Sequence, residues 1–192
     1  MHKTRDVITI GVIGAREPGR EIACAAAVAG YRTVLEDVMP EMLEQGLAQI
    51  RESLEAAIAR GELRREQSNA ALAKISTARS VEGACREADL LIEACPDELE
   101  LKLEIFTLFD RFAWPGAILA SGTMFFSIAD LAAMTFRAQN CVGLQFSNSA
   151  ANRSLVKIIR GVDTSEATIA ACKEVARRMG REVVVVSEPS QV

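Results

Sequence analysis

The sequence predicts an α/β fold in which a doubly wound, mostly parallel sheet carries helices on both faces. Short apolar, β-branched runs alternate with segments whose apolar residues recur every three or four positions, a pattern typical of strands alternating with amphipathic helices. Residues 8–37 contain a strand, a glycine-bearing loop, a helix and a second strand, which together form a βαβ unit. A long helical pair is inserted after this second strand.

The strands are predicted from apolar runs bounded by polar or turn residues. The first run, residues 8–14, is almost entirely apolar, as expected of a strand buried on both faces. The last two runs are expected to join the sheet in a sense different from the others. The predicted strands cover residues 8–14, 32–37, 75–78, 88–95, 117–121, 141–146, 155–159 and 183–186.

The helices are predicted from apolar stripes and from their end signals. Pro18 suits the first turn of a helix over residues 22–29, and Gly30 suits the position just after its end. Gly61 should end the first helix of the inserted pair, and residues 65–74 form the second. Further helices are expected over residues 127–134 and 165–179, and over a segment with Leu99, Leu103, Phe106 and Phe109 on one side.

Composition limits the class of protein. The chain has 192 residues, a net charge of −4, 49% hydrophobic and 25% charged residues, which is typical of one globular domain, here taken as residues 1–192. The mild acidity argues against nucleic acid as a partner, and no apolar run is long enough to span a membrane. The cytoplasm is the expected location. Five scattered cysteines are interpreted as buried free thiols, and no metal site is expected.

A glycine loop follows the first predicted strand. It reads Gly14-Ala15-Arg16-Glu17-Pro18-Gly19, so the first and third glycines of the dinucleotide-binding pattern G-x-G-x-x-G are present and the second is Arg16. Asp37 ends the second strand, where a carboxylate can accept hydrogen bonds from an adenosine ribose and disfavours a 2′-phosphate. The loop therefore indicates a Rossmann-type domain that prefers NAD to NADP. The alternative is that both glycines only turn the chain and that Asp37 is a solvated strand-end residue.

Arg16 allows two opposed interpretations. Its side chain either crowds the pyrophosphate, which approaches the backbone where the pattern has glycine, or its guanidinium binds phosphate oxygens. We favour crowding, which would weaken NAD binding.

An ordered set of motifs resembles one known family. The set comprises residues 11–14, Gly19-Arg20, 29–37, the helical pair, 88–94 and 117–121. These motifs resemble the NAD-binding domain of the L-3-hydroxyacyl-CoA dehydrogenases over essentially the whole chain. The resemblance implies a Rossmann-type fold, NAD as cofactor and oxidation of a 3-hydroxyacyl-CoA in fatty acid metabolism. A helical C-terminal domain normally follows in that family, and the chain ends at Val192, where the resemblance places its start, so we expect that domain to be absent.

The catalytic residues of the resembled family are substituted. Its catalytic histidine lies in Gly-Leu-His-Phe-Phe-Asn-Pro, and the matching stretch, residues 143–149, carries Gln145 instead. The glutamate that orients this histidine is replaced by Lys157, and the family's Asn-Thr-Ser becomes Gly122-Thr123-Met124. Thr123 and Asn148 remain, and Glu93 matches in the preceding strand, where the resemblance places it among the cofactor-binding residues.

Chemistry agrees that the standard reaction is lost or weak. Oxidation of a secondary alcohol by NAD needs a base, and glutamine cannot change its protonation state. The chain's one histidine, His2, precedes the first strand and is expected at the edge of the sheet opposite the ligand site. Lys157 is an alternative base only if it is desolvated, since a solvated lysine stays protonated at pH 7.

Two further features are weaker. Basic residues of the helical pair either meet CoA phosphates or form an ordinary solvated face, which we favour; they are Arg60, Arg64, Arg65 and Lys74. The loop Met124-Phe125-Phe126 places three large apolar residues where the ligand cleft is expected, and it either fills the cleft, covers it or contacts another chain.

Three hypotheses follow. The first is a domain of the 3-hydroxyacyl-CoA dehydrogenase type with a degenerate active site that still takes NAD and an acyl-CoA-type molecule. The second is a non-catalytic interaction or regulatory module with a filled cleft, pairing with a second copy or another chain. The third is an active dehydrogenase that uses another base.

Overall fold

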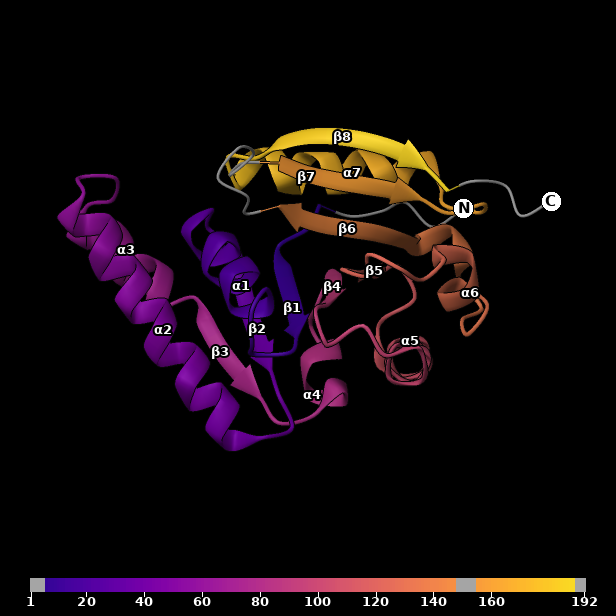
Figure 1. The fold of residues 1–192 in the computed structure, drawn as a ribbon, viewed down its shortest axis with the longest axis horizontal. Coiled ribbons are helices and arrows are strands. Elements are labelled where there is room, and N and C mark those ends of the chain that lie inside the picture. The colour runs from indigo at the N-terminus through magenta and orange to yellow at the C-terminus, as the bar shows by residue number, and fades with distance from the viewer. Residues whose placement is uncertain (1–5, 148–154, 189–192) are drawn as a thin grey trace.

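The computed structural model describes residues 6–147 and 155–188, and their strands form one sheet in the order β3-β2-β1-β4-β5-β6-β7-β8 (Figure 1). All neighbouring strands are parallel except β6 and β7, which are antiparallel. The last two strands therefore run against the others, as expected. The strands are β1 (Thr9–Ile13), β2 (Arg32–Glu36), β3 (Ile75–Ala78), β4 (Leu90–Glu93), β5 (Ile118–Ser121), β6 (Cys141–Ser147), β7 (Leu155–Arg160) and β8 (Glu182–Ser187).

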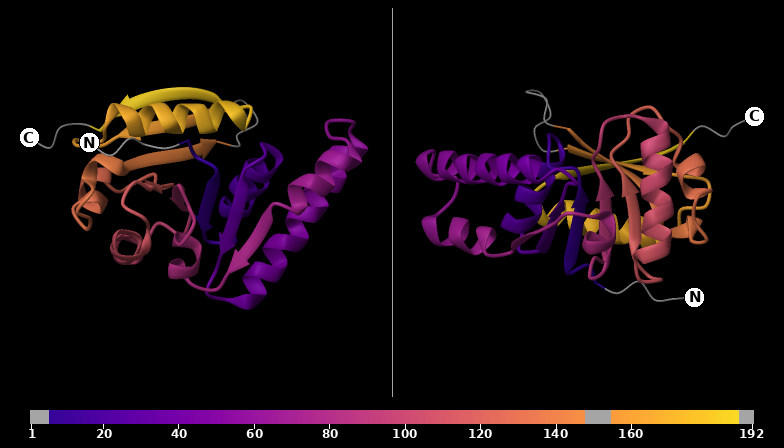
Figure 2. Two further views of the ribbon diagram at one scale, coloured as in Figure 1. Left: turned by 180° about the vertical axis from the view of Figure 1, so that it is seen from behind. Right: turned by 90° about the horizontal axis from the view of Figure 1, so that it is seen from below.

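Helices cover both faces of this sheet, so the fold is of the Rossmann type that the sequence predicts (Figure 2). Helices α1 (Gly19–Val28), α2 (Pro40–Ala59) and α7 (Glu166–Arg178) contribute to the core of one face. Helices α4 (Val81–Cys85), α5 (Leu99–Phe112) and α6 (Ile128–Ala132) contribute to the other. Helix α3 (Arg65–Leu72) lies beside α2 at the β3 end of the sheet, and the short 3₁₀ helix η1 (Ala138–Asn140) precedes β6.

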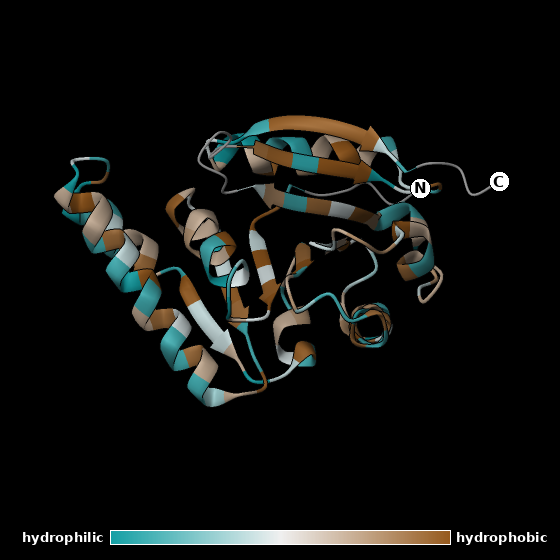
Figure 3. Cartoon of the chain, in the orientation of Figure 1, coloured by the Kyte–Doolittle hydropathy of each residue, from teal (hydrophilic) through white to brown (hydrophobic). Residues whose placement is uncertain are grey.

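Strand β4 shows why both faces carry a core. Leu90 and Ile92 belong to the core on the α1 face, and Leu91 belongs to the core on the α5 face, because successive side chains of a strand point to opposite sides. All four residues of β4 are buried. Figure 3 shows hydrophobic colour along most of β8, a largely neutral colour along β3 and mixed colours along α2.

The expected helix ends are confirmed. Gly30 and Gly61 follow the last residues of α1 and α2 after one intervening residue, with φ angles of 97° and 74°. Both angles lie in the left-handed region that favours glycine, so these two positions end their helices as the sequence predicts.

The structure corrects several details. Strand β4 is shorter than the predicted run of residues 88–95. Just before it, the Asp89 carboxylate accepts hydrogen bonds from the backbone N–H groups of Ile8 and Thr9, at 2.9 and 3.0 Å. The short helix α4 was not predicted, because five residues hold too little periodicity to reveal it. Cys24 and Cys95 are only half-buried, although all five cysteines are free thiols.

The apolar stripe of α5 also differs from the prediction. Leu99 is exposed and Leu103 is only half-buried, whereas the buried face consists of Lys102, Ile105, Phe106 and Phe109. Lys102 therefore lies on the buried face of α5, where the sequence predicted Leu103. No helix within residues 6–147 and 155–188 is long and apolar enough to cross a membrane.

Candidate functional site

The site lies along the carboxyl ends of the parallel strands. The loops that follow β1, β2, β4 and β5 all leave the sheet at this edge, because these strands run in one direction. Ligands of open α/β sheets bind outside this edge. Two cavities occur here among the described residues, one beside the glycine loop and one between β6, β7 and the loop after β5.

The glycine loop is packed tightly between β1 and α1. The N–H of Gly14 donates to the carbonyl of Glu36 at 2.9 Å, and Gly14 has a φ of 104°. A Cβ on Gly19 would lie 1.9 Å from the carbonyl oxygen of Gly14. The dinucleotide-binding pattern has its third glycine for such close packing of helix against strand, and Gly19 meets that requirement.

Asp37 joins the loops that follow β1 and β2. Its Oδ2 accepts a hydrogen bond from the N–H of Ala15 at 3.1 Å, and its Oδ1 accepts one from the N–H of Met39 at 3.0 Å. The carboxylate is thus fixed at the strand end, beside the glycine loop. It is a half-buried residue held by two backbone amides rather than a freely solvated one.

The first cavity has a volume of about 700 Å³ and suits the adenosine half of a dinucleotide. Gly14, Arg16 and Asp37 line one side of it, and the apolar side chains of Leu101 and Ile105 line another. A fixed carboxylate beside a glycine turn is the acceptor that a ribose hydroxyl requires, so the residues present fit NAD. Arg16 is exposed at the rim and is the one cation among the described lining residues.

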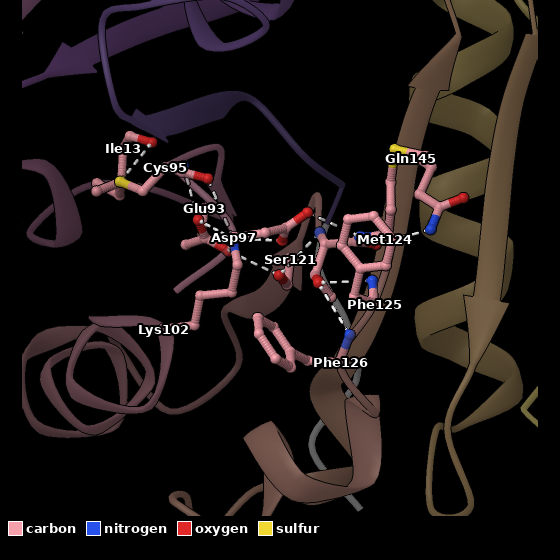
Figure 4. A network of polar contacts seen from close by, with 11 residues as sticks. Ile13, Glu93, Cys95, Asp97, Lys102, Ser121, Met124, Phe125, Phe126 and Gln145 are labelled. Atoms are coloured by element: carbon pink, nitrogen blue, oxygen red, sulfur yellow. Dashed lines mark hydrogen bonds and ion pairs between the residues drawn. The ribbon is translucent and has the colours of Figure 1, made fainter. Parts of the chain in front are cut away.

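A buried ion pair supports the wall of this cavity (Figure 4). Lys102 Nζ lies 2.8 and 2.9 Å from the two carboxylate oxygens of Glu93, and these side chains are 1% and 0% exposed. Ser121 Oγ and the N–H of Cys95 also donate to Glu93, each at 2.6 Å.

The same network holds the loop after β4. Lys102 Nζ donates to the carbonyl of Cys95 at 3.2 Å and lies 3.3 Å from Asp97 Oδ1, and both Cys95 and Asp97 line the first cavity. Burial raises the pKa of the Cys95 thiol to about 12, so this sulfur is a neutral wall group. Glu93 thus positions the cavity wall, and its direct contact with a cofactor stays a prediction. Sequence reasoning missed Lys102, whose one signal was its place in line with Ile105, Phe106 and Phe109.

The second cavity contains the two positions at which the resemblance expects the catalytic residues. Its volume is about 640 Å³, and Thr123, Gln145 and Lys157 line it together. Gln145 is paired with Lys157 in the antiparallel register of β6 and β7. Gln145 Nε2 donates to the carbonyl of Thr123 at 2.7 Å, which fixes the orientation of the amide. The structure therefore brings these residues to one place, whereas Asn148 and His2 lie outside the described residues.

The loop after β5 borders this cavity. Gly122 donates its N–H to the carbonyl of Glu93 at 2.8 Å, and Thr123 Oγ1 accepts from the N–H groups of Phe125 and Phe126 at 3.2 and 3.1 Å. Met124 and Phe125 are 70% and 77% exposed, so they line the cavity without filling it.

Glu188 closes the other side of the second cavity, and sequence reasoning missed it. Its carboxylate accepts hydrogen bonds from the N–H groups of Ile128 and Ala129 and from Ser127 Oγ, at the start of α6. A carboxylate is favourable at a helix N-terminus, and this contact ties β8 to the loop after β5.

The basic residues of the helical pair lie at exposed positions. Arg60 is paired with Glu62 and Arg65 with Glu55. Two of the four candidates for CoA phosphates therefore have acidic partners within the chain, as the interpretation of a solvated face predicts.

Comparisons with known proteins agree with this geometry. Residues 9–189 match the model of the 3-hydroxyacyl-CoA dehydrogenase, NAD binding domain. The chain is 36% identical over 176 residues to a 3-hydroxybutyryl-CoA dehydrogenase of Bradyrhizobium diazoefficiens, covering 92% of this chain and 60% of that protein. It is 34% identical over 183 residues to a probable 3-hydroxybutyryl-CoA dehydrogenase of Bacillus subtilis, covering 95% and 63%.

Solved structures give the same result. The (S)-3-hydroxybutyryl-CoA dehydrogenase of Ralstonia eutropha superposes with a TM-score of 0.91 at 32% identity, covering 96% of this chain and 65% of that one. The chain thus spans less than two thirds of the length of each of these relatives. By sequence, fold and the placement of its glycine loop, the chain belongs to the 3-hydroxyacyl-CoA dehydrogenase family and corresponds to its NAD-binding domain, with NAD as cofactor.

Proposed function

We propose that this chain is a single domain that binds NAD in the first cavity and an acyl-CoA-type molecule in the second, with the hydride-transfer chemistry of its family lost or greatly weakened. The observation that carries the proposal is the pairing of Gln145 with Lys157 at the catalytic positions. The relatives named above are dehydrogenases of 3-hydroxybutyryl-CoA, which supports a CoA thioester as the ligand.

Three features support the placement of NAD. Gly14 and Gly19 form the turn, and the Asp37 carboxylate is fixed at the end of β2, where a ribose hydroxyl can donate to it. When bound, NAD supplies the acceptor for the hydride. The residues of the chain hold the ribose, enclose the adenosine and keep a 2′-phosphate away through the charge of Asp37.

The second cavity supports binding without efficient turnover. A 3-hydroxyl group gives up its proton as the hydride leaves, and the amide of Gln145 cannot accept it. The Gln145 N–H already donates to Thr123. Lys157 is exposed, so it lacks the desolvation by which a lysine becomes a base. Loss of a general base typically costs about 10²–10⁴ in rate.

A fluorescence titration tests the proposal. NADH is titrated into the purified chain with and without acetoacetyl-CoA, and the consumption of NADH is followed at its absorbance maximum. We expect saturable NADH binding, a change in NADH fluorescence on addition of acetoacetyl-CoA, and no measurable oxidation. The matched control is Asp37→Asn, which removes the charge at the ribose position and should weaken NADH binding.

Two outcomes would replace the proposal. Oxidation of NADH that disappears in Lys157→Ala would identify an active dehydrogenase that uses this lysine as its base. A complete lack of NADH binding, both in the unmodified chain and in Arg16→Gly, would favour the interaction module. The exposed Met124 and Phe125 beside the second cavity are the specific observation that keeps this second candidate in view.

A further inference from the structure

Glu36, the last residue of β2, has a buried carboxyl group with one oxygen that makes no hydrogen bond within the described part of the chain. The residue is 2% exposed, and its Oε1 has no hydrogen-bond partner among the described residues. Val34, two residues earlier in β2 and therefore on the same face of the sheet, packs against the core on the α5 face. Glu36 therefore occupies a position where an apolar side chain would be expected, and a buried polar group without a partner is unfavourable for folding.

This carboxyl group lies in the wall of the first cavity. The wall near it is apolar and includes Val81, Leu101, Ile105 and Leu108. Such a surface suits a flat aromatic ring, and a few placed polar groups determine which ring is accepted. Asp37 already holds two backbone amides at the ribose position, so Glu36 is the buried acid of this wall that still has an oxygen without a hydrogen bond to any described residue.

The charges around Glu36 are mostly negative. Burial and the neighbouring carboxylate of Asp37 raise the pKa of Glu36 to about 7. Arg16 is the one cation among the described lining residues and is exposed at the rim. The titratable and charged groups that face Glu36 or share its cavity are Asp37 directly after β2, Cys85 on α4, Cys95 and Asp97 after β4, Glu104 on α5, and Arg16 and Glu17 in the glycine loop.

We infer that Glu36 determines which base the site accepts, by receiving a hydrogen bond from the exocyclic amine of a 6-amino purine and rejecting a 6-oxo purine. This inference rests on the proposed binding of NAD in the first cavity. An amine at this ring position supplies N–H donors to the carboxylate. A carbonyl in its place would set an acceptor against the carboxylate at ring position 6, where neither oxygen has a donor, and such a contact costs more than the loss of an apolar contact.

The protonation of Glu36 makes the inference testable by pH. When ionised, the carboxylate accepts only, and it should prefer the amine. When protonated, it can also donate to a carbonyl, so the preference should shrink below pH 7. Glutamine at this position accepts through its oxygen and donates through its nitrogen, so it should accept both bases at any pH.

The experiment compares NADH with its reduced hypoxanthine analogue, which has a carbonyl in place of the amine and a hydrogen on the neighbouring ring nitrogen N1. Both are titrated by fluorescence into the unmodified chain, Glu36→Gln and Glu104→Gln at pH 6 and pH 8. Glu104 lines the same cavity from an exposed position on α5, so its substitution removes an equal charge and serves as the matched control. Thermal melting verifies that each variant is folded.

We expect the unmodified chain and Glu104→Gln to bind NADH at least about tenfold more tightly than the analogue at pH 8, with a smaller ratio at pH 6. Glu36→Gln should bind NADH and the analogue with nearly equal affinity at both pH 6 and pH 8. Equal binding of both dinucleotides by the unmodified chain at pH 8, or an unchanged ratio in Glu36→Gln, would overturn the inference and leave the proposed function intact. Failure of NADH itself to bind would overturn both.

Discussion

Gln145 and Lys157 are direct partners in the antiparallel ladder between β6 and β7. Directly opposite residues on one face of such a pair have Cβ atoms about 4.5–5.5 Å apart, so their side chains influence each other. The family's acid–base pair, as the resemblance places it, occupies these two positions. In this chain the two positions carry an amide and a lysine side chain.

An introduced imidazole would report on this pairing. In Gln145→His, the ammonium of Lys157 should lower the pKa of the new imidazole, since a nearby like charge disfavours its protonation. In the double variant Gln145→His/Lys157→Glu, the carboxylate should raise that pKa by about one pH unit or more relative to the single variant. Titration by NMR measures both values, with His2 as a second signal in the same sample. Equal values in the two variants would show that the two side chains do not interact.

Arg16→Gly should strengthen NADH binding by about threefold or more, because the substitution restores the glycine at which the backbone approaches the pyrophosphate. Fluorescence titration at two salt concentrations measures the effect. Arg32→Ala, which removes an exposed cation from the opposite end of β2, is the control for net charge. Weaker binding in Arg16→Gly, together with a loss of salt dependence, would show instead that the guanidinium binds phosphate.

Lys102→Met should lower the free energy of unfolding by about 3–5 kcal/mol, because it leaves the fully buried Glu93 carboxylate without its cation. The double variant Glu93→Gln/Lys102→Met should recover part of this loss. Denaturant unfolding measures the free energy of unfolding of the unmodified chain, the single variant and the double variant. Arg86→Met breaks a pair with Glu82 whose side chains are 70% and 45% exposed, so it should cost less than about 1 kcal/mol. A similar cost for Lys102→Met and Arg86→Met would contradict the role of the buried network.

Glu36 should make stability depend on pH in a defined direction. Its pKa is about 7 in the folded chain against 4.5 for the ordinary side chain, so the folded state binds the proton more tightly than the unfolded state. The stability that this group contributes to the folded chain is therefore fully present below pH 4.5. About 3 kcal/mol of the free energy of unfolding is lost as the pH rises through 7. Glu36→Gln should stabilise the chain more at pH 8 than at pH 5 in urea unfolding. Glu104→Gln, at an exposed position, should not show this difference.

The sequence predicted the sheet well because its strands are regular apolar runs. Gly30, Gly61 and the β-branched residues of β1 each follow a local rule, and local rules survive in the folded chain. The candidate site was predicted where a motif gave the spacing, as for Gly14 and Asp37.

The rest depended on contacts between distant segments. Glu36 and Lys102 are buried at positions where a hydrophobic pattern expects apolar residues, so the pattern gave no sign of either. Glu188 reaches α6 from β8 across 60 residues of sequence. The register pairs Gln145 with Lys157, and the alternation of side chains alone does not fix it, because a shift by two residues would keep the same faces.

The packing of Gly14 and Gly19 shows that some positions of the glycine loop are restricted by the fold, while another is restricted only by a ligand. A side chain on Gly19 would collide with the backbone of the chain itself, and Gly14 needs its left-handed conformation, whether or not a cofactor is present. Arg16 is exposed and meets no such restriction. In descendants of this domain that no longer bind a cofactor, Gly14 and Gly19 should therefore be retained while the residue at position 16 varies freely. The identity of residue 16 then indicates whether a lineage still binds the cofactor.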